Sequence, residues 1–172
     1  MKTAFIGHRQ VYAKDIDKRL MIAIEREIEN GCMSFIMGTH GEFDRRVLSV
    51  CKSLRRNYKE LKIEAVITNF TMLKNIKNEA ENYGDVDTVM YDIEEVHYKR
   101  RITLSNRMMI DECDTLICYV KPSKQISGAK TALSYAKRKG LKIINLYSEE
   151  DEPFFGMTKE QIAEYLQVHD MQ

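Results

Sequence analysis

Glycines and polar side chains follow the short apolar segments of this sequence, at positions where a phosphorylated ligand could be held. The apolar residues 4–6 end at Gly7, which is followed by His8 and Arg9. A glycine at a strand end lets the backbone turn or approach a ligand closely. An arginine beside it can donate paired hydrogen bonds to phosphate oxygens. The alternative is a plain turn with two solvated side chains, and we favour ligand contact because position and chemistry agree.

A second polar turn begins at Gly38 and runs into a predicted helix. The free backbone N–H groups at a helix start favour an anion. Acidic residues in that first turn could accept hydrogen bonds from ribose hydroxyls, or they could only cap the helix. His40 could act as a general base, although a histidine in a surface turn is the simpler interpretation. The candidate ligand residues here are Gly38, Gly41, Glu42, Phe43 and Asp44.

Small residues open another predicted helix at Ser127, Gly128 and Ala129, and the Thr131 hydroxyl in its first turn is a further candidate donor to a phosphate. Ser127 could cap this helix or offer its hydroxyl to a phosphate, and small neighbours would let the phosphate reach the N–H groups. An ordinary helix cap is the alternative. The dinucleotide-binding pattern G-x-G-x-x-G and the Walker lysine motif are both missing.

Strand-like and helix-like segments alternate and would position these loops. Strands are predicted at 4–6, 33–37, 61–68, 86–91, 115–120 and 141–147, and helices at 15–29, 43–54, 72–83, 101–112, 128–139 and 158–168. In the first helix, Glu25, Glu27 and Glu29 lie mostly off the apolar face. This alternation predicts an α/β fold with a Rossmann-like, doubly wound, mostly parallel sheet flanked by helices. In such sheets the ligand lies beyond the carboxyl ends of the strands, where the strand order reverses.

Length and composition limit the classes of protein that need to be considered. A chain of 172 residues is expected to form a single domain, here 1–172 with a core at about 3–147 and a C-terminal helix at about 158–168. The 27 Lys and Arg balance the 26 Asp and Glu, which argues against a general nucleic-acid binder. We expect no membrane span, no secretory signal, no cofactor and no metal site. The four cysteines are predicted to be buried reduced thiols, which favours the cytoplasm.

Four motifs occur in a fixed order along the chain. They are Phe5-Ile6-Gly7-His8-Arg9, Met37-Gly38-x-x-Gly41-x-Phe43-Asp44, Asn106-Arg107-Met108-Met109-Ile110-Asp111, and Ser127-Gly128-Ala129 followed by Tyr135-Ala136-x-x-x-Gly140. Together they resemble the SLOG superfamily, which groups the DprA/SMF proteins with the LOG cytokinin-activating enzymes, and they are most similar to the YpsA-like branch of Firmicutes and their phages. With the alternation, the resemblance predicts the strand order 3-2-1-4-5, counting 115–120 as fourth and 141–147 as fifth. The segment 86–91 would add an edge strand.

The resemblance implies a pocket for a nucleotide or a nucleotide-derived ligand. It assigns Asn106 and Arg107 to the site, although spacing alone would leave Arg107 as a solvated helix residue. The LOG loop P-G-G-x-G-T-x-x-E, aligned on Thr131, places its catalytic glutamate at Ser134. Serine cannot replace a carboxylate in glycosidic-bond cleavage.

Three functions from different classes follow. The first is binding or sensing of a nucleoside phosphate or an ADP-ribose type of ligand. The second is an N-glycosidic hydrolase or transferase that acts on nucleoside monophosphates with Glu42 or Asp44 as its carboxylate. Binding of single-stranded DNA is the weakest of the three. The sequence also predicts a homo-oligomer, formed as a dimer through the helix that carries Met108 and Met109.

Overall fold

Six strands form one sheet in the computed structural model, which describes residues 1–68, 85–93, 95–123 and 125–169. They are β1 (Lys2–Gly7), β2 (Ser34–Met37), β3 (Lys62–Ile67), β4 (Asp87–Met90), β5 (Thr115–Tyr119) and β6 (Lys142–Asn145). The spatial order is β4-β3-β2-β1-β5-β6, and every neighbouring pair is parallel. The predicted strand order, with its extra edge strand, is therefore confirmed.

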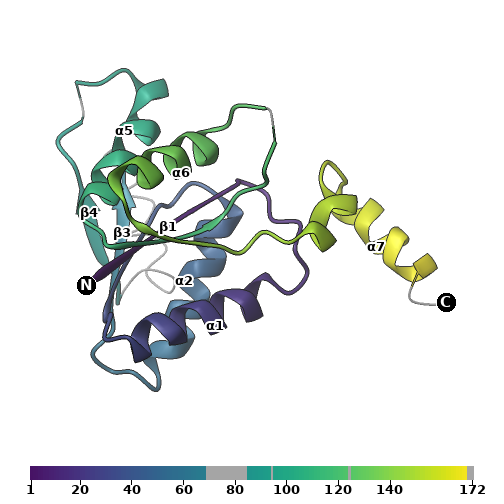
Figure 1. Cartoon of the computed structure of the whole chain (residues 1–172), viewed down its shortest axis with the longest axis horizontal. Helices are drawn as coiled ribbons and strands as arrows, with labels where there is room; N and C mark the ends of the chain where they lie inside the picture. The colour runs from purple at the N-terminus through teal and green to yellow at the C-terminus, as the bar shows by residue number, and fades with distance from the viewer. Residues whose placement is uncertain (69–84, 94, 124, 170–172) are drawn as a thin grey trace.

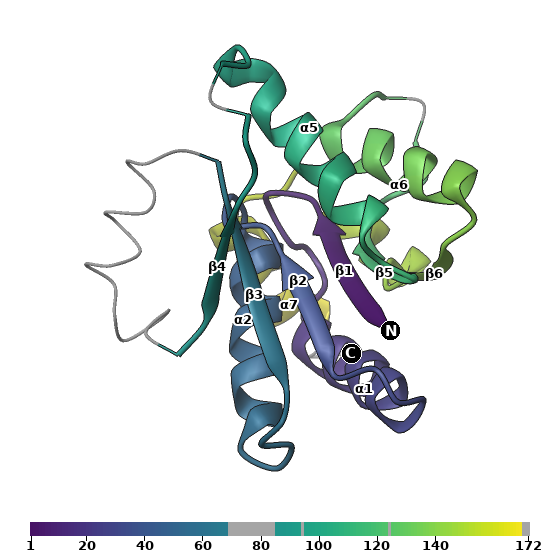
Figure 2. The same ribbon diagram turned by 90° about the vertical axis from the view of Figure 1, so that its left-hand side faces the viewer.

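The helices cover both faces of the sheet. Helices α1 (Ile16–Glu29) and α2 (Glu42–Arg55) lie on one face, and α5 (Tyr98–Asp111) and α6 (Gly128–Lys139) lie on the other (Figure 1; Figure 2). The helices that follow β1 and β2 lie on one face, whereas α5, which leads into β5, lies on the other. The direction in which successive strands are added therefore reverses between the neighbouring strands β1 and β5. This is the α/β Rossmann-like architecture that the alternation of segments predicts. The helix predicted at 72–83 lies outside the described residues.

The central strand β5 shows why the sheet needs both helical layers. Leu116 and Cys118 pack on the side of α5 and α6, whereas Ile117 and Tyr119 pack on the side of α1 and α2. All four side chains are fully buried. A strand that is buried at every position is typical of a parallel sheet covered on both faces.

The C-terminal segment leaves the sheet after β6. It forms a 3₁₀ helix, η1 (Glu149–Phe154), and then α7 (Lys159–His169), which extends away from the sheet in Figure 1. The predicted start of α7 is confirmed, because the Thr158 N–H donates to Gln161 and the Gln161 N–H donates back to the Thr158 hydroxyl. No residue of α7 between Lys159 and His169 is buried.

The prediction that Glu27 lies off the apolar face of α1 is wrong. Its side chain is buried, with only 3% of the residue exposed. Its carboxylate accepts a hydrogen bond from the Thr115 hydroxyl at 3.0 Å, and the Lys142 Nζ lies 2.5 Å from its other oxygen. Partners on β5 and β6 therefore stabilise a buried charge that helical spacing alone cannot anticipate.

All four cysteines are buried and free, as predicted. Burial raises the pKa of Cys51 and of Cys118 to about 12, so both are protonated thiols at neutral pH. The reducing compartment that we infer from them stays a prediction. Within the described part of the chain, no helix is long and apolar enough to cross a membrane.

The methionine pair on α5 contributes to the core of its own chain. Met109 is 1% exposed, and Met108 is partly buried against the cluster beneath α5 and α6. Little of the surface of these two methionines is therefore exposed for a dimer interface. Self-association stays a prediction.

Candidate functional site

A cavity of about 450 Å³ lies at the carboxyl ends of β1 and β2, facing the start of α6. This is the edge at which the strand order reverses, where Rossmann-like sheets hold their ligands. The volume is in the range of small-molecule sites. The lining residues come from the end of β1, from the loops after β1 and β2, from the starts of α2 and α6, and from one face of α5: Phe5, Ile6, Gly7, His8, Arg9, Gly38, His40, Gly41, Asp44, Ile102, Thr103, Asn106, Ser127, Gly128 and Ala129.

Most of the residues singled out in the sequence meet at this cavity. The ones that line it are Gly7, His8, Arg9, Gly38, Gly41, Asp44, Asn106, Ser127, Gly128 and Ala129. The ones that do not are Glu42, Phe43, Arg107 and Thr131. The sheet thus brings together segments more than 100 residues apart, but contact with a ligand stays a prediction for each residue.

Phe43 supports the floor of the site instead of facing it. Its side chain is 1% exposed and packs directly under Gly7, where an added Cβ would come within 2.3 Å of the ring. Glu42 is turned toward the loop after β1, since its Oε2 accepts the Val11 N–H at 3.2 Å. Its Oε1 lies 3.6 Å from the Arg46 guanidinium on the same helix. Of the two candidate carboxylates, only Asp44 therefore borders the cavity.

Arg107 and Thr131 lie beside the cavity, along a narrow crevice between α5 and α6. The crevice shares Asn106 and Gly128 with the cavity lining. Arg107 is exposed, and its guanidinium carbon lies 5.5 Å from the centre of the Tyr135 ring. Arg107 is solvated, as helical spacing predicts. It also lies next to the cavity, which is the region to which the family resemblance assigns it.

Asp44 is held by the turn that precedes it. Its Oδ2 accepts the N–H groups of His40 at 2.9 Å and Gly41 at 3.2 Å, which completes the capping of α2. The carboxylate comes so near Gly38 that a Cβ there would lie 3.0 Å from Oδ2. Burial raises the pKa of Asp44 to about 6, against the lowering effect of these two N–H groups.

The raised pKa of Asp44 predicts how the stability of the protein depends on pH. The folded state favours the protonated carboxyl, so this stabilisation is complete below about pH 4 and is lost as the pH rises through about 6. Asp44→Asn keeps an acceptor oxygen and removes the titration. At pH 7.5 the variant should exceed the wild type in free energy of unfolding by up to about 3 kcal/mol, and at pH 4 the two should agree. Urea unfolding at both pH values measures this, and a difference of equal size at both would contradict the assignment.

Both histidines of the site make hydrogen bonds within the protein, and the pKa of each is lowered. His8 Nε2 accepts the Lys121 N–H at 3.1 Å, and burial lowers the pKa of His8. His40 Nε2 lies 3.2 Å from the Thr68 hydroxyl, and burial together with Arg9 lowers the pKa of His40. His40 lies in a turn, as predicted, and its side chain is half-buried at the cavity wall.

The anion-binding end that the sequence suggests is the start of α6. Ser127 is the N-cap, and its hydroxyl accepts the Lys130 N–H at 3.2 Å. A Cβ added at Gly128 would meet nothing within 4 Å, so the backbone there opens onto free space. The first turn of α6 contains no acidic residue. This terminus therefore offers N–H groups and a favourable dipole to a negative charge.

Sequence reasoning missed Ile102 and Thr103, which line the cavity from α5. They lie four and three residues before Asn106, so all three share one face of the helix. The position of Asn106 could therefore have indicated both residues, because they lie one helical turn before it.

This geometry defines an α/β Rossmann-like fold with an all-parallel sheet. Among solved structures, the chain is similar to the X-ray structure of DNA processing protein A (DprA) from Streptococcus pneumoniae, with 16% sequence identity and a TM-score of 0.57. The match covers 97% of this chain and 56% of that one, so the chain spans little more than half the length of its structural neighbour. No family model matches the sequence, and no curated protein matches it. A likeness at this identity shows the fold alone.

Proposed function

We propose that this domain binds or senses a nucleotide or a nucleotide-derived ligand, such as a nucleoside phosphate or an ADP-ribose type of molecule. The observation that carries the proposal is the cavity at the point of strand reversal, bordered by the open N-terminus of α6 at Gly128. The motif pattern also supports placing the chain near the YpsA-like branch of the SLOG superfamily.

The chemistry of the cavity walls orients the ligand. The phosphate lies at the start of α6, where N–H groups point outward and Arg107 stands at the adjoining crevice. Arg9, which is exposed at the mouth, adds positive charge. Asp44 lies across the cavity and accepts ribose hydroxyls, because a carboxylate beside a phosphate would be repelled.

A second candidate function is cleavage at an N-glycosidic bond. Asp44 favours it, since a carboxyl at the cavity with a pKa of about 6 can exchange protons near neutral pH. No glutamate occupies the position that the LOG pattern gives to its catalytic residue, where this chain has the exposed Ser134. Binding without turnover is therefore the better supported proposal. DNA, which the name of the structural neighbour suggests, remains the weakest ligand class for a chain of net charge +1.

One incubation separates the two candidates. The four nucleoside 5′-monophosphates and ADP-ribose are added one at a time to the protein, and both the melting temperature and released base are measured. We expect at least one of them to raise the melting temperature with no free base formed. At a hundredfold excess over Kd the stabilisation should be about 2.7 kcal/mol. Base released by the wild type but not by Asp44→Asn would instead establish the enzyme.

A further inference from the structure

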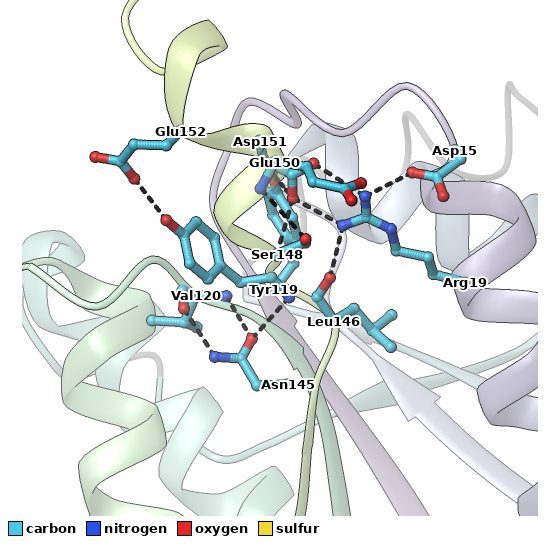
Figure 3. A network of polar contacts seen from close by, with 11 residues as sticks. Asp15, Arg19, Tyr119, Val120, Asn145, Leu146, Ser148, Glu150, Asp151 and Glu152 are labelled. Carbon is cyan, nitrogen blue, oxygen red and sulfur yellow. Dashed lines mark hydrogen bonds and ion pairs between the residues drawn. The ribbon is translucent and has the colours of Figure 1, made fainter.

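A buried carboxylate, Asp151, anchors the segment after β6, residues 148–155, to the domain. We call this segment the C-terminal strap. Asp151 is 3% exposed, and its two oxygens accept Arg19 Nη1 at 2.8 Å and Nη2 at 3.0 Å. The Tyr119 hydroxyl donates to the same carboxylate at 3.2 Å, and the Ser148 N–H donates at 3.1 Å (Figure 3). A paired and fully hydrogen-bonded charge of this kind fixes the strap in one position.

The strap contacts two residues next to the cavity. The Phe155 ring packs edge-on against the His8 ring, with centroids 6.2 Å apart and planes at 83°. Lys121 Nζ lies 2.6 Å from the Glu152 carboxylate and 4.7 Å from the centre of the Phe155 ring. His8 and Lys121 are also joined to each other, because the Lys121 N–H donates to His8 Nε2 at 3.1 Å.

These two residues come from different loops. His8 lines the cavity in the loop after β1, whereas Lys121 lies outside the lining, in the connection from β5 to Ser127 at the start of α6. Tyr119 completes the link, since its ring packs against both His8 and Phe155 at centroid distances of 6.4 and 6.2 Å. The strap therefore holds His8 and Lys121 in one mutual position.

We propose that the C-terminal strap is a positioning element of the ligand site, and that Asp151 is the positioning residue that sets ligand affinity through His8 and Lys121. The part that concerns affinity rests on the proposed nucleotide function. Neither Asp151 nor Phe155 lines the cavity, so both act through the residues that they hold. Release of the strap would loosen the anion-binding end of the site.

The alternative is that the strap only covers the aromatic core. If the strap positions the site, Asp151→Asn, which removes the negative charge, should loosen His8 and Lys121. If the strap only covers the core, those two residues should be unaffected. Arg19 keeps its hydrogen bond to the Leu146 carbonyl at 3.0 Å and its contact with Asp15 at 2.7 Å, so the arginine is not left unpaired. Phe155→Ala is the second variant, because it removes the ring from His8 and keeps the Asp151 contacts. Glu149→Gln is the matched control, since it removes one charge from the exposed side of η1.

Amide hydrogen exchange of the ligand-free protein is the first measurement. In Asp151→Asn and Phe155→Ala the amides of His8 and Lys121 should exchange about tenfold faster, while the amides of β2 keep their wild-type rates. Glu149→Gln should match the wild type at every amide. Unchanged exchange at His8 and Lys121 in both strap variants would overturn the proposal, whatever ligand the domain binds.

Titration with AMP and with ADP-ribose is the second measurement. If either binds the wild type, both strap variants should bind it roughly tenfold more weakly, a change of about 1.4 kcal/mol. Equal affinity despite faster exchange would overturn the link to affinity. If neither binds the wild type, the nucleotide proposal loses its support, and the exchange result alone decides whether the strap positions the two loops.

Discussion

Gly7→Ala should destabilise the fold by about 3 kcal/mol, although it adds only one methyl group. The new Cβ would lie 2.3 Å from the Phe43 ring and 2.7 Å from the Phe43 Cβ, far inside ordinary contact. Phe43 is buried at the start of α2, so it cannot move without shifting that helix against the sheet. The φ angle of Gly7 is not positive, so the close contact alone requires the glycine.

Thermal and urea unfolding measure this effect. For a chain of this length, a loss of about 3 kcal/mol corresponds to a fall in melting temperature of roughly 6–12 °C. Gly128→Ala is the matched control and should unfold like the wild type, because its Cβ meets no atom within 4 Å. Phe43→Leu, added to Gly7→Ala, makes room for the methyl group and should recover part of the loss. A Gly7→Ala protein as stable as the wild type would show that Phe43 does not support the loop in this way.

The architecture could be predicted from the sequence because its signals are periodic. The apolar run 115–120 and the helical spacing of Leu20, Ile24 and Ile28 each indicate one element, and the structure confirms both. The boundaries of α6 at Gly128 and Lys139 were also predicted, since Ser127 caps the start and Gly140 ends the helix with a φ of 79°. Such local signals depend on few distant contacts.

The details of the site depend on contacts that no local pattern contains. Glu42 and Asp44 have the same chemistry and lie two residues apart, yet only Asp44 faces the cavity. The Val11 N–H draws Glu42 toward the first loop, whereas the His40 N–H holds Asp44 at the turn. The strap falls between the strand predicted at 141–147 and the helix predicted at 158–168, where no element is predicted, but it forms η1 around Asp151. The bond between Arg19 and Asp151 joins residues 132 positions apart, and spacing cannot predict it.

Gly128→Asp should weaken nucleotide binding by ten- to a hundredfold. The side chain would point into the open space beside the first turn of α6, where the proposal places the phosphate. The loss of a charge-assisted hydrogen bond costs roughly 1.5–3 kcal/mol, and that range converts to this range of affinity. The fold should be preserved, because an acidic residue in the first turn stabilises a helix.

Two further variants separate charge from size at this position. Gly128→Asn has nearly the same shape as the aspartate and no charge, so it should weaken binding less. Gly128→Ala should bind nearly as the wild type does. If Asn and Asp weaken binding equally, steric exclusion explains the loss and the phosphate charge does not.

Calorimetric titration of the wild type and Gly128→Asp with the nucleotide that most raises the melting temperature is the most direct test of the proposed site. The result that we predict is a one-to-one complex for the wild type and a ten- to hundredfold larger Kd for Gly128→Asp, with both proteins folded by circular dichroism. Equal affinities of the two proteins would contradict the placement of the phosphate at the start of α6.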